Sequence, residues 1–272
     1  MSLFTASLNS GSNGNCYYIG NEQDAVLVDA GLSCRETEKR LRRMGLNMGK
    51  IKAIFISHEH GDHIKGIQNI AFKHQVPVYI TAATLHSGRL HIQEHLVRHF
   101  SAHEPVAVGS LTVTAFPKLH DAADPHSFVI SGNGVNVGVL TDIGEACEQV
   151  HTYFNKCHAA FLEANYDDAM LEQGRYPYHL KKRISGSYGH LSNQQALDLF
   201  LAHRATGMSH VFLSHLSKDN NDPDLAAALF SAHAGKTKVV VASRYTESEV
   251  YEVRAAEPVS YFARRAIQVE MF

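Results

Sequence analysis

The fold is decided by one short stretch, Ile56-Ser57-His58-Glu59-His60-Gly61-Asp62-His63. The apolar run at 53–56 is typical of a buried strand, and apolar residues at helical spacing follow at Ile64, Ile67 and Ala71. The loop between them gathers imidazole and carboxylate side chains, which are ligands for zinc, iron or manganese. Such a tight cluster favours a metal site over a loop of merely solvated histidines.

The spacing His58-x-His60-x-Asp62-His63 resembles the signature of the metallo-β-lactamase superfamily. The resemblance implies a four-layer αββα sandwich, with one or two metal ions at the edge of its two sheets. The chain shows no linker, repeat or low-complexity tract between residues 1 and 272. We therefore expect one metallo-β-lactamase-like α/β domain over residues 1–272.

Composition excludes several classes of protein. The 272 residues are 44% hydrophobic and 19% charged, as in globular proteins, and the formal charge of −2 gives no overall attraction to nucleic acid. The four cysteines show no C-x-x-C spacing, which argues against a zinc knuckle or a disulfide framework. No signal peptide and no apolar run of about 18 residues is present, so we expect a cytoplasmic protein without a membrane span.

Capping residues predict where several helices begin. Ser33 predicts the start of a helix that runs to Met44, and Ser192 predicts the start of a helix from Asn193 to His203. A third helical region is expected at 83–99. It carries four histidines, which we interpret as an exposed polar face rather than as a metal-binding stripe: His86, His91, His95 and His99.

Short apolar runs predict the strands of the second half, at 111–116, 127–130, 135–140, 159–162 and 211–213, with 238–242 and 250–253 closing the sheet. Ligand-type residues follow three of these strands: His120, Asp142 and His215. Strand ends are where α/β folds place functional residues. His103 and His126 compete with His120 for the first of these positions.

The resemblance implies a site for two divalent ions, which could be zinc, manganese or iron. His58, His60 and His120 would hold the first ion. Asp62, His63 and His215 would hold the second, with Asp142 bridging the two. In the same superfamily an Asp-x-Gly at the position of Asp29-Ala30-Gly31 supports the metal loop from behind.

Further motifs resemble one branch of the superfamily. Gly189-His190-Leu191-Ser192-Asn193 resembles the extra histidine motif of its nucleic-acid-processing members. The segments at 10–16, 163–165 and 214–221 resemble the YycJ/WalJ-like subgroup, whose members are described as metal-dependent 5′→3′ exonucleases on DNA. The expected reaction is phosphodiester hydrolysis by a hydroxide that bridges the metals.

Roles for individual residues follow from that expectation. Asp62 would orient the hydroxide and accept its proton, and His190 would assist departure of the leaving oxygen. Four further residues are expected to contact the DNA substrate: Lys181, Lys182, Arg183 and Asn193. Phosphate contacts of this kind make binding salt-dependent and largely independent of sequence.

Three other functions remain open. A small-molecule hydrolase acting on an ester, lactone or cyclic phosphodiester would have a narrow apolar pocket and no role for His190. A diiron redox protein of the superfamily carries Glu in place of His60, so His60 disfavours that function. A non-catalytic scaffold should have lost some of the seven candidate ligands. The sequence indicates no oligomeric state.

Overall fold

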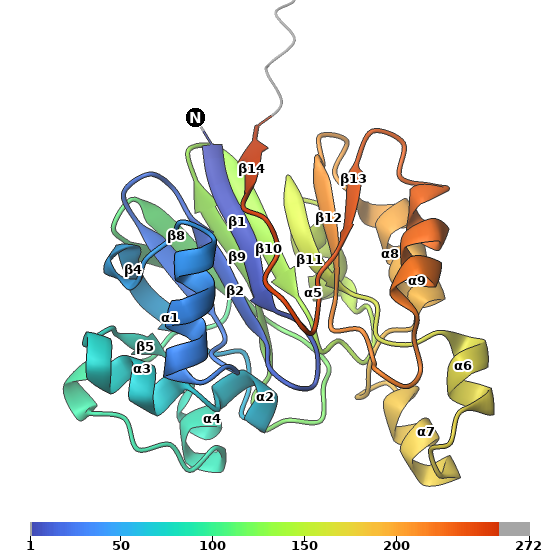
Figure 1. The fold of residues 1–272 in the computed structure, drawn as a ribbon, viewed down its shortest axis with the longest axis horizontal. Helices are drawn as coiled ribbons and strands as arrows, with labels where there is room; N and C mark the ends of the chain where they lie inside the picture. Colours follow the sequence, from blue (N-terminus) through green and yellow to red (C-terminus); the bar gives the residue numbers. More distant parts are fainter. Residues whose placement is uncertain (1, 256–272) are drawn as a thin grey trace, which may run out of the picture.

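Two mixed seven-stranded β-sheets pack face to face in the computed structural model, which describes residues 2–255 (Figure 1). In order across it, the first sheet contains β14 (Tyr251–Arg254), β1 (Ser2–Asn9), β2 (Cys16–Gly20), β3 (Ala25–Val28), β4 (Ile51–Phe55), β5 (Val78–Tyr79) and β6 (Val97–Arg98). The second contains β13 (Lys238–Val241), β12 (His210–Ser214), β11 (Ala159–Glu163), β10 (Val135–Leu140), β9 (His126–Gly132), β8 (Leu111–Pro117) and β7 (Pro105–Val108).

Helices cover the outer faces of both sheets (Figure 1). The first sheet carries α1 (Cys34–Arg43), α2 (Gly61–Ile64), α3 (Ile67–His74) and α4 (Ala82–Ser87), with short 3₁₀ turns at η1 (Met48–Lys50) and η2 (Glu94–Leu96). The second sheet carries α5 (Glu148–Phe154), α8 (Asn193–His203) and α9 (Pro223–Ser231), and α6 (Asp168–Gln173) and α7 (Tyr178–Ile184) project beside it. The predicted αββα architecture is confirmed, whereas one domain over residues 1–272 stays a prediction.

Alternation along the strands builds three apolar layers. In β12, Phe212 points into the core between the sheets, whereas Val211 and Leu213 pack towards the outer helices. In β3, Val26 lies in the inner core and Leu27 packs towards α1 and α3. Successive strand residues face opposite sides of a sheet, so each strand supplies both layers.

The parallel strands place their carboxyl ends at one edge of the sandwich. β3 and β4 are parallel in the first sheet, and β10, β11 and β12 are parallel in the second. Loops after β4, β10, β11 and β12 therefore meet at this edge, in the lower part of Figure 1. This is the edge at which the candidate ligands were predicted.

Both helix starts predicted from serine caps are confirmed. Ser33 accepts a hydrogen bond from the backbone N–H of Glu36 at the start of α1. Ser192 forms a reciprocal capping box with Gln195 at the start of α8. The structure places each helix where the cap predicted it.

Two predictions about secondary structure were wrong. The helix expected at 83–99 ends at Ser87, because Gly88 caps it and Arg89 has a left-handed φ of 48°. The chain then continues into η2 and β6, so the four histidines share no helix face. The two C-terminal strands do not close one sheet either: β13 pairs with β12, and β14 pairs with β1 in the opposite sheet.

Candidate metal centre

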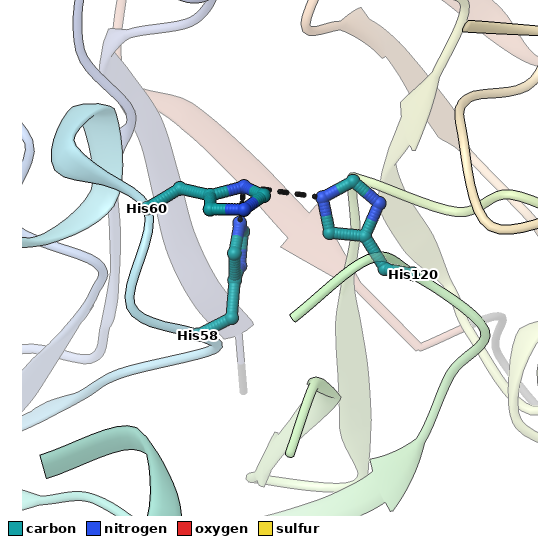
Figure 2. A group of neighbouring side chains, drawn as sticks. All are labelled: His58, His60 and His120. Carbon is teal, nitrogen blue, oxygen red and sulfur yellow. Dashed lines mark hydrogen bonds between the residues drawn. The ribbon is translucent and has the colours of Figure 1, made fainter. Parts of the chain in front are cut away.

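Three histidines converge at the edge of the sandwich (Figure 2). His58 and His60 lie on the loop after β4, and His120 lies on the loop after β8. His58 Nε2 lies 3.1 Å from His60 Nδ1, which lies 3.3 Å from His120 Nε2. Each residue offers a nitrogen within 4.8 Å of the other two, a spacing compatible with one shared metal ion.

A second group of ligand atoms adjoins the first. Asp62 and His63 come from α2, and His215 directly follows β12. Asp62 Oδ2 lies 3.6 Å from His63 Nε2 and 3.5 Å from His215 Nε2. Loops that follow strands of different sheets therefore bring these three residues together, as the sequence predicted.

Asp142 lies between the two groups. One of its carboxylate oxygens is 3.2 Å from His63 Nε2, and the other is 3.3 Å from His215 Nδ1 and 3.8 Å from His120 Nε2. The carboxylate thus reaches members of both groups. This is the position that a bridging ligand requires.

The backbone is strained at three points around this cluster. Asp142, His215 and Asp29 have positive φ angles of 56°, 58° and 62°. Non-glycine residues adopt this left-handed conformation at a cost of roughly 1–3 kcal/mol each. Such strain persists where the surrounding structure holds a side chain in one direction, and here Asp142 and His215 point into the cluster.

Asp29 orients the histidines of the metal loop. Its carboxylate accepts hydrogen bonds from the backbone N–H and the hydroxyl of Ser57, each at 2.9 Å, and from Nδ1 of His63 at 2.8 Å. Because the Ser57 hydroxyl donates to Asp29, its oxygen accepts from Nδ1 of His58 at 2.9 Å. Both imidazoles therefore keep Nε2 available as a ligand atom. This geometry supports the buttressing role that the resemblance implied.

Glu163 is a functional candidate that the sequence reasoning missed. It ends β11, is fully buried and accepts hydrogen bonds from Nδ1 of His215 at 2.9 Å and of His190 at 2.8 Å. Its second oxygen accepts from the backbone N–H groups of Ile143 and Leu191. Glu163 therefore fixes the rings of His215 and His190, with Nε2 of each directed away from it. The sequence signals were its place at a strand end and its membership of the segment 163–165, which resembles the YycJ/WalJ-like subgroup.

Lys118 is a second residue that the sequence did not single out. It is buried, and its ammonium group donates a hydrogen bond of 2.6 Å to the carbonyl of Thr141, next to Asp142. Burial lowers the pKa of Lys118, while the nearby carboxylate of Asp142 acts in the opposite direction. The contact anchors the segment after β10 that contains the strained residue Asp142.

The ligand atoms fit a divalent cation. Asp142 Oδ2 and His215 Nε2 are buried and have no hydrogen-bond partner within residues 2–255, a costly state unless a cation faces them. Burial opposes protonation of His63, yet the carboxylates of Asp142 and Asp29 raise its pKa well above the ordinary value. Burial also lowers the pKa of His215, but the carboxylates of Asp142, Asp62 and Glu163 outweigh it and raise that pKa to about 10. The site therefore attracts positive charge.

A cavity of about 250 Å³ opens onto the cluster. Besides candidate ligands, its wall includes His190 and Arg183, and Arg183 Nε donates to Asp121 Oδ2 at 2.6 Å. Among residues 2–255, the cavity is lined by Ser12, His60, Asp62, Asp121, Asp142, Arg183, Ile184, Gly189, His190 and His215. A substrate in this cavity reaches the cluster, an imidazole and a guanidinium together.

The structure places three of the four predicted substrate contacts outside this cavity. Asn193 is buried, and its amide exchanges hydrogen bonds with that of Asn221, away from the cavity. Lys181 and Lys182 line a different hollow, beside α6. Arg183 alone of the four reaches the cavity wall.

The alternatives to His120 lie elsewhere. His126 is buried against Phe100, and its Nδ1 donates to the carbonyl of Asp124. His103 stacks on Tyr153. The structure therefore brings only His120 of these three to the other ligand candidates.

Gly31 tests how tightly the metal loop is packed. A Cβ atom on Gly31 would lie 1.7 Å from the carbonyl oxygen of Asp62, so Gly31→Ala must displace the loop. We expect this variant to lose about 3 kcal/mol of unfolding free energy and much of its bound metal. Gly61→Ala is the matched control, since a Cβ there meets nothing within 4 Å. Urea unfolding and metal analysis measure the two effects. Equal unfolding free energies and equal metal contents in the two variants would contradict the expectation.

Comparisons with known proteins agree with this geometry. Residues 24–216 match the family described as the beta-lactamase superfamily domain. The chain is 33% identical over 267 residues to exodeoxyribonuclease YycJ of Bacillus anthracis, covering 95% of this chain and 97% of that relative. It is 30% identical over 227 residues to exodeoxyribonuclease WalJ of Streptococcus pneumoniae, covering 80% and 83%. The fold resembles the metallo-β-lactamase fold protein YhfI from Bacillus subtilis, with a TM-score of 0.72, 16% identity and coverage of 93% and 100%.

The sandwich and its histidine–aspartate cluster define a metal-dependent hydrolase that uses divalent ions. The chain belongs to the metallo-β-lactamase superfamily and, within it, to the group that includes the YycJ and WalJ exodeoxyribonucleases. The family and fold expected from the His-x-His-x-Asp-His motif are thereby confirmed. Within residues 2–255, no helix has the length and apolar character that crossing a membrane requires.

Proposed function

We propose that this protein is a 5′→3′ exonuclease that hydrolyses the phosphodiester bonds of DNA with two divalent ions, in the cytoplasm. The observation that carries the proposal is the polar cavity in which the ligand cluster, His190 and Arg183 face the same space. A phosphodiester needs cationic groups around its charged oxygens and a proton for its leaving oxygen. The exodeoxyribonuclease relatives support DNA as the substrate.

The ligand set divides into two groups. His58, His60 and His120 would hold one ion. Asp62, His63 and His215 would hold the other, with Asp142 shared between them. Bound zinc, manganese or iron supplies Lewis acidity and lowers the pKa of water towards neutrality.

Asp62 and His190 lie on the cavity wall and would handle the protons of the reaction. Asp62 stays ionised, because the histidines beside it outweigh burial and lower its pKa to about 2. Its carboxylate therefore accepts a hydrogen bond from the attacking water and orients it. Nδ1 of His190 donates to Glu163, so Nε2 is the nitrogen that would protonate the leaving oxygen.

Arg183 would contact a phosphate of the DNA backbone. Its side chain is 62% exposed and is held over the cavity by Asp121. We expect Arg183→Gln to raise KM roughly tenfold with little change in kcat, and to lower the slope of log binding constant against log salt by about one. Arg42→Gln, on the outer face of α1, is the control. Equal salt slopes in both variants would contradict the assignment.

The main alternative is a small-molecule ester, lactone or cyclic phosphodiester hydrolase. An apolar ester calls for an apolar pocket, whereas charged and polar side chains line this cavity. That lining favours a phosphate-bearing substrate.

The deciding experiment follows mononucleotide release from 5′-phosphorylated single-stranded and duplex DNA, with Mn²⁺ or Zn²⁺ added. We expect release from the 5′ end, and a phosphorothioate block at the 5′ terminus should stop it. Release from the 3′ end would overturn the polarity. Absence of release with any metal, together with robust cleavage of an ester or a cyclic dinucleotide, would overturn the nuclease function.

A further inference from the structure

A second cluster of metal-ligand side chains lies on the outer face of the first sheet, where α1 contacts α3 (Figure 1). Cys34 is the first residue of α1, Glu38 lies one turn further along, and His74 is the last residue of α3. None of the three belongs to the candidate metal centre described above. Their thiol, carboxylate and imidazole are the three side-chain types that bind zinc in proteins.

The three ligand atoms already converge. The thiol of Cys34 lies 3.5 Å from Glu38 Oε1, and Nε2 of His74 lies 2.7 Å from the same oxygen. All three lie within 4.8 Å of one another and are partly buried. Zinc–ligand bonds of about 2.0–2.3 Å in a tetrahedral site place the ligand atoms about 3.3–3.8 Å apart, so only small side-chain movements would admit the ion.

We propose that Cys34, Glu38 and His74 form a separate binding site for one thiophilic divalent ion, typified by Zn²⁺, with solvent as the fourth ligand. The site differs in chemistry from the candidate metal centre, which contains no thiol. Sulfur ligation favours zinc and disfavours manganese and magnesium. The two sites therefore select metals differently.

Charge balance shows what the ion would replace. The ammonium group of Lys73 lies 2.6 Å from Glu38 Oε1, on a side chain that is 58% exposed and free to turn outwards. Hydrogen bonds from Lys73 and His74 lower the pKa of Glu38 to about 2, so the carboxylate is charged at neutral pH. Binding releases the thiol proton of Cys34 to solvent, and the ion takes the place of the ammonium group beside Glu38.

The location links this site to the metal loop. α1 follows the segment at 29–33, and α3 follows the loop and α2. The two segments are joined by hydrogen bonds from Ala30 N–H to the His63 carbonyl at 2.7 Å and from Gly66 N–H to the Ala30 carbonyl at 2.8 Å. An ion bound by Cys34, Glu38 and His74 would link α1 to α3. Because both helices follow the segments that these hydrogen bonds join, the ion would stabilise the structure around the metal loop.

Cobalt(II) substitution tests the site without measuring activity. A thiolate bound to Co²⁺ gives a near-ultraviolet charge-transfer band, which the histidine–aspartate centre cannot produce. We expect titration of the full-length protein to raise this band to a plateau that corresponds to one thiolate-bound Co²⁺ per chain, and Zn²⁺ to remove it. The melting temperature should rise as the band develops.

Matched variants identify the cysteine and the competing ammonium. Cys34→Ser should lose the band, whereas Cys147→Ser, at the other partly buried cysteine, should keep it. Lys73→Gln should bind Co²⁺ more tightly, which a folding defect cannot mimic. Asp142→Asn, in the candidate metal centre, should leave the band intact, so this result is independent of the nuclease assay.

Alkylation provides a measurement that needs no variant. Zn²⁺ should protect Cys34 from iodoacetamide and leave Cys147 unprotected, as read by peptide mass spectrometry. The proposal would be overturned if the wild-type protein gave no band, or if the band survived Cys34→Ser. Weaker Co²⁺ binding by Lys73→Gln, or equal alkylation of Cys34 and Cys147 in the presence of Zn²⁺, would also overturn it.

Discussion

Asp142→Asn is expected to release bound metal and to lower turnover on the order of 10³-fold or more. The substitution keeps the shape of the side chain but removes the one charge that reaches both ligand groups. The carboxylate lies 3.2 Å from His63 and 3.3 Å from His215, and nearby histidines hold its pKa well below the usual range despite burial. A neutral amide cannot offset two divalent cations at this position.

The measurement pairs metal analysis with the rate of mononucleotide release. Asp24→Asn is the matched control, because Asp24 accepts hydrogen bonds from Ser110 and belongs to neither group of candidate ligands. Both variants should unfold cooperatively when freed of metal with a chelator. Wild-type metal content and rate in Asp142→Asn would contradict the bridging role.

The sequence predicted the ligands whose positions depend on residues that are close together in the chain. His58, His60, Asp62 and His63 are close in the chain, and the strand before them and the helix after them fix their direction. Partners at strand ends were also predictable, because parallel strands end at one edge of a sheet. Asp142 and His215 lie at that edge.

Residues whose role depends on packing across the fold were not predictable. Glu163 resembles any polar residue at a strand end until β11 and β12 lie side by side and place it under two imidazoles. Asn193 was predicted to contact the substrate, yet in the structure its amide exchanges hydrogen bonds with that of Asn221. A contact between distant segments leaves no spacing pattern in the chain.

The failed helix at 83–99 shows a related limit. Histidines at intervals of four or five suggested one helical face, but Gly88 and the left-handed Arg89 end the helix early. Val97 and Arg98 then add a strand to β5. The pairing of this segment with the sheet outweighed a weak local preference for helix. Propensities read from a single sequence do not capture such pairing.

His190→Ala is expected to slow DNA hydrolysis by about 10²–10⁴-fold, the usual contribution of a general acid. Nδ1 of His190 donates to the buried carboxylate of Glu163 at 2.8 Å, which fixes the ring and directs Nε2 away from Glu163. The ring lies on the cavity wall and its side chain is 21% exposed, so Nε2 is accessible to substrate. Loss of the ring leaves the departing oxygen without its proton donor.

A substrate with a good leaving group separates this role from a structural one. Thymidine 5′-(p-nitrophenyl phosphate) releases p-nitrophenolate, which needs no proton, so His190→Ala should cleave it at close to the wild-type rate. His179→Ala, which removes an exposed imidazole from the nearby helix α7, should leave both rates unchanged. Equal losses on both substrates would mean that His190 positions the site through Glu163 and His215. Unchanged rates on both substrates would show that His190 has no role in the reaction.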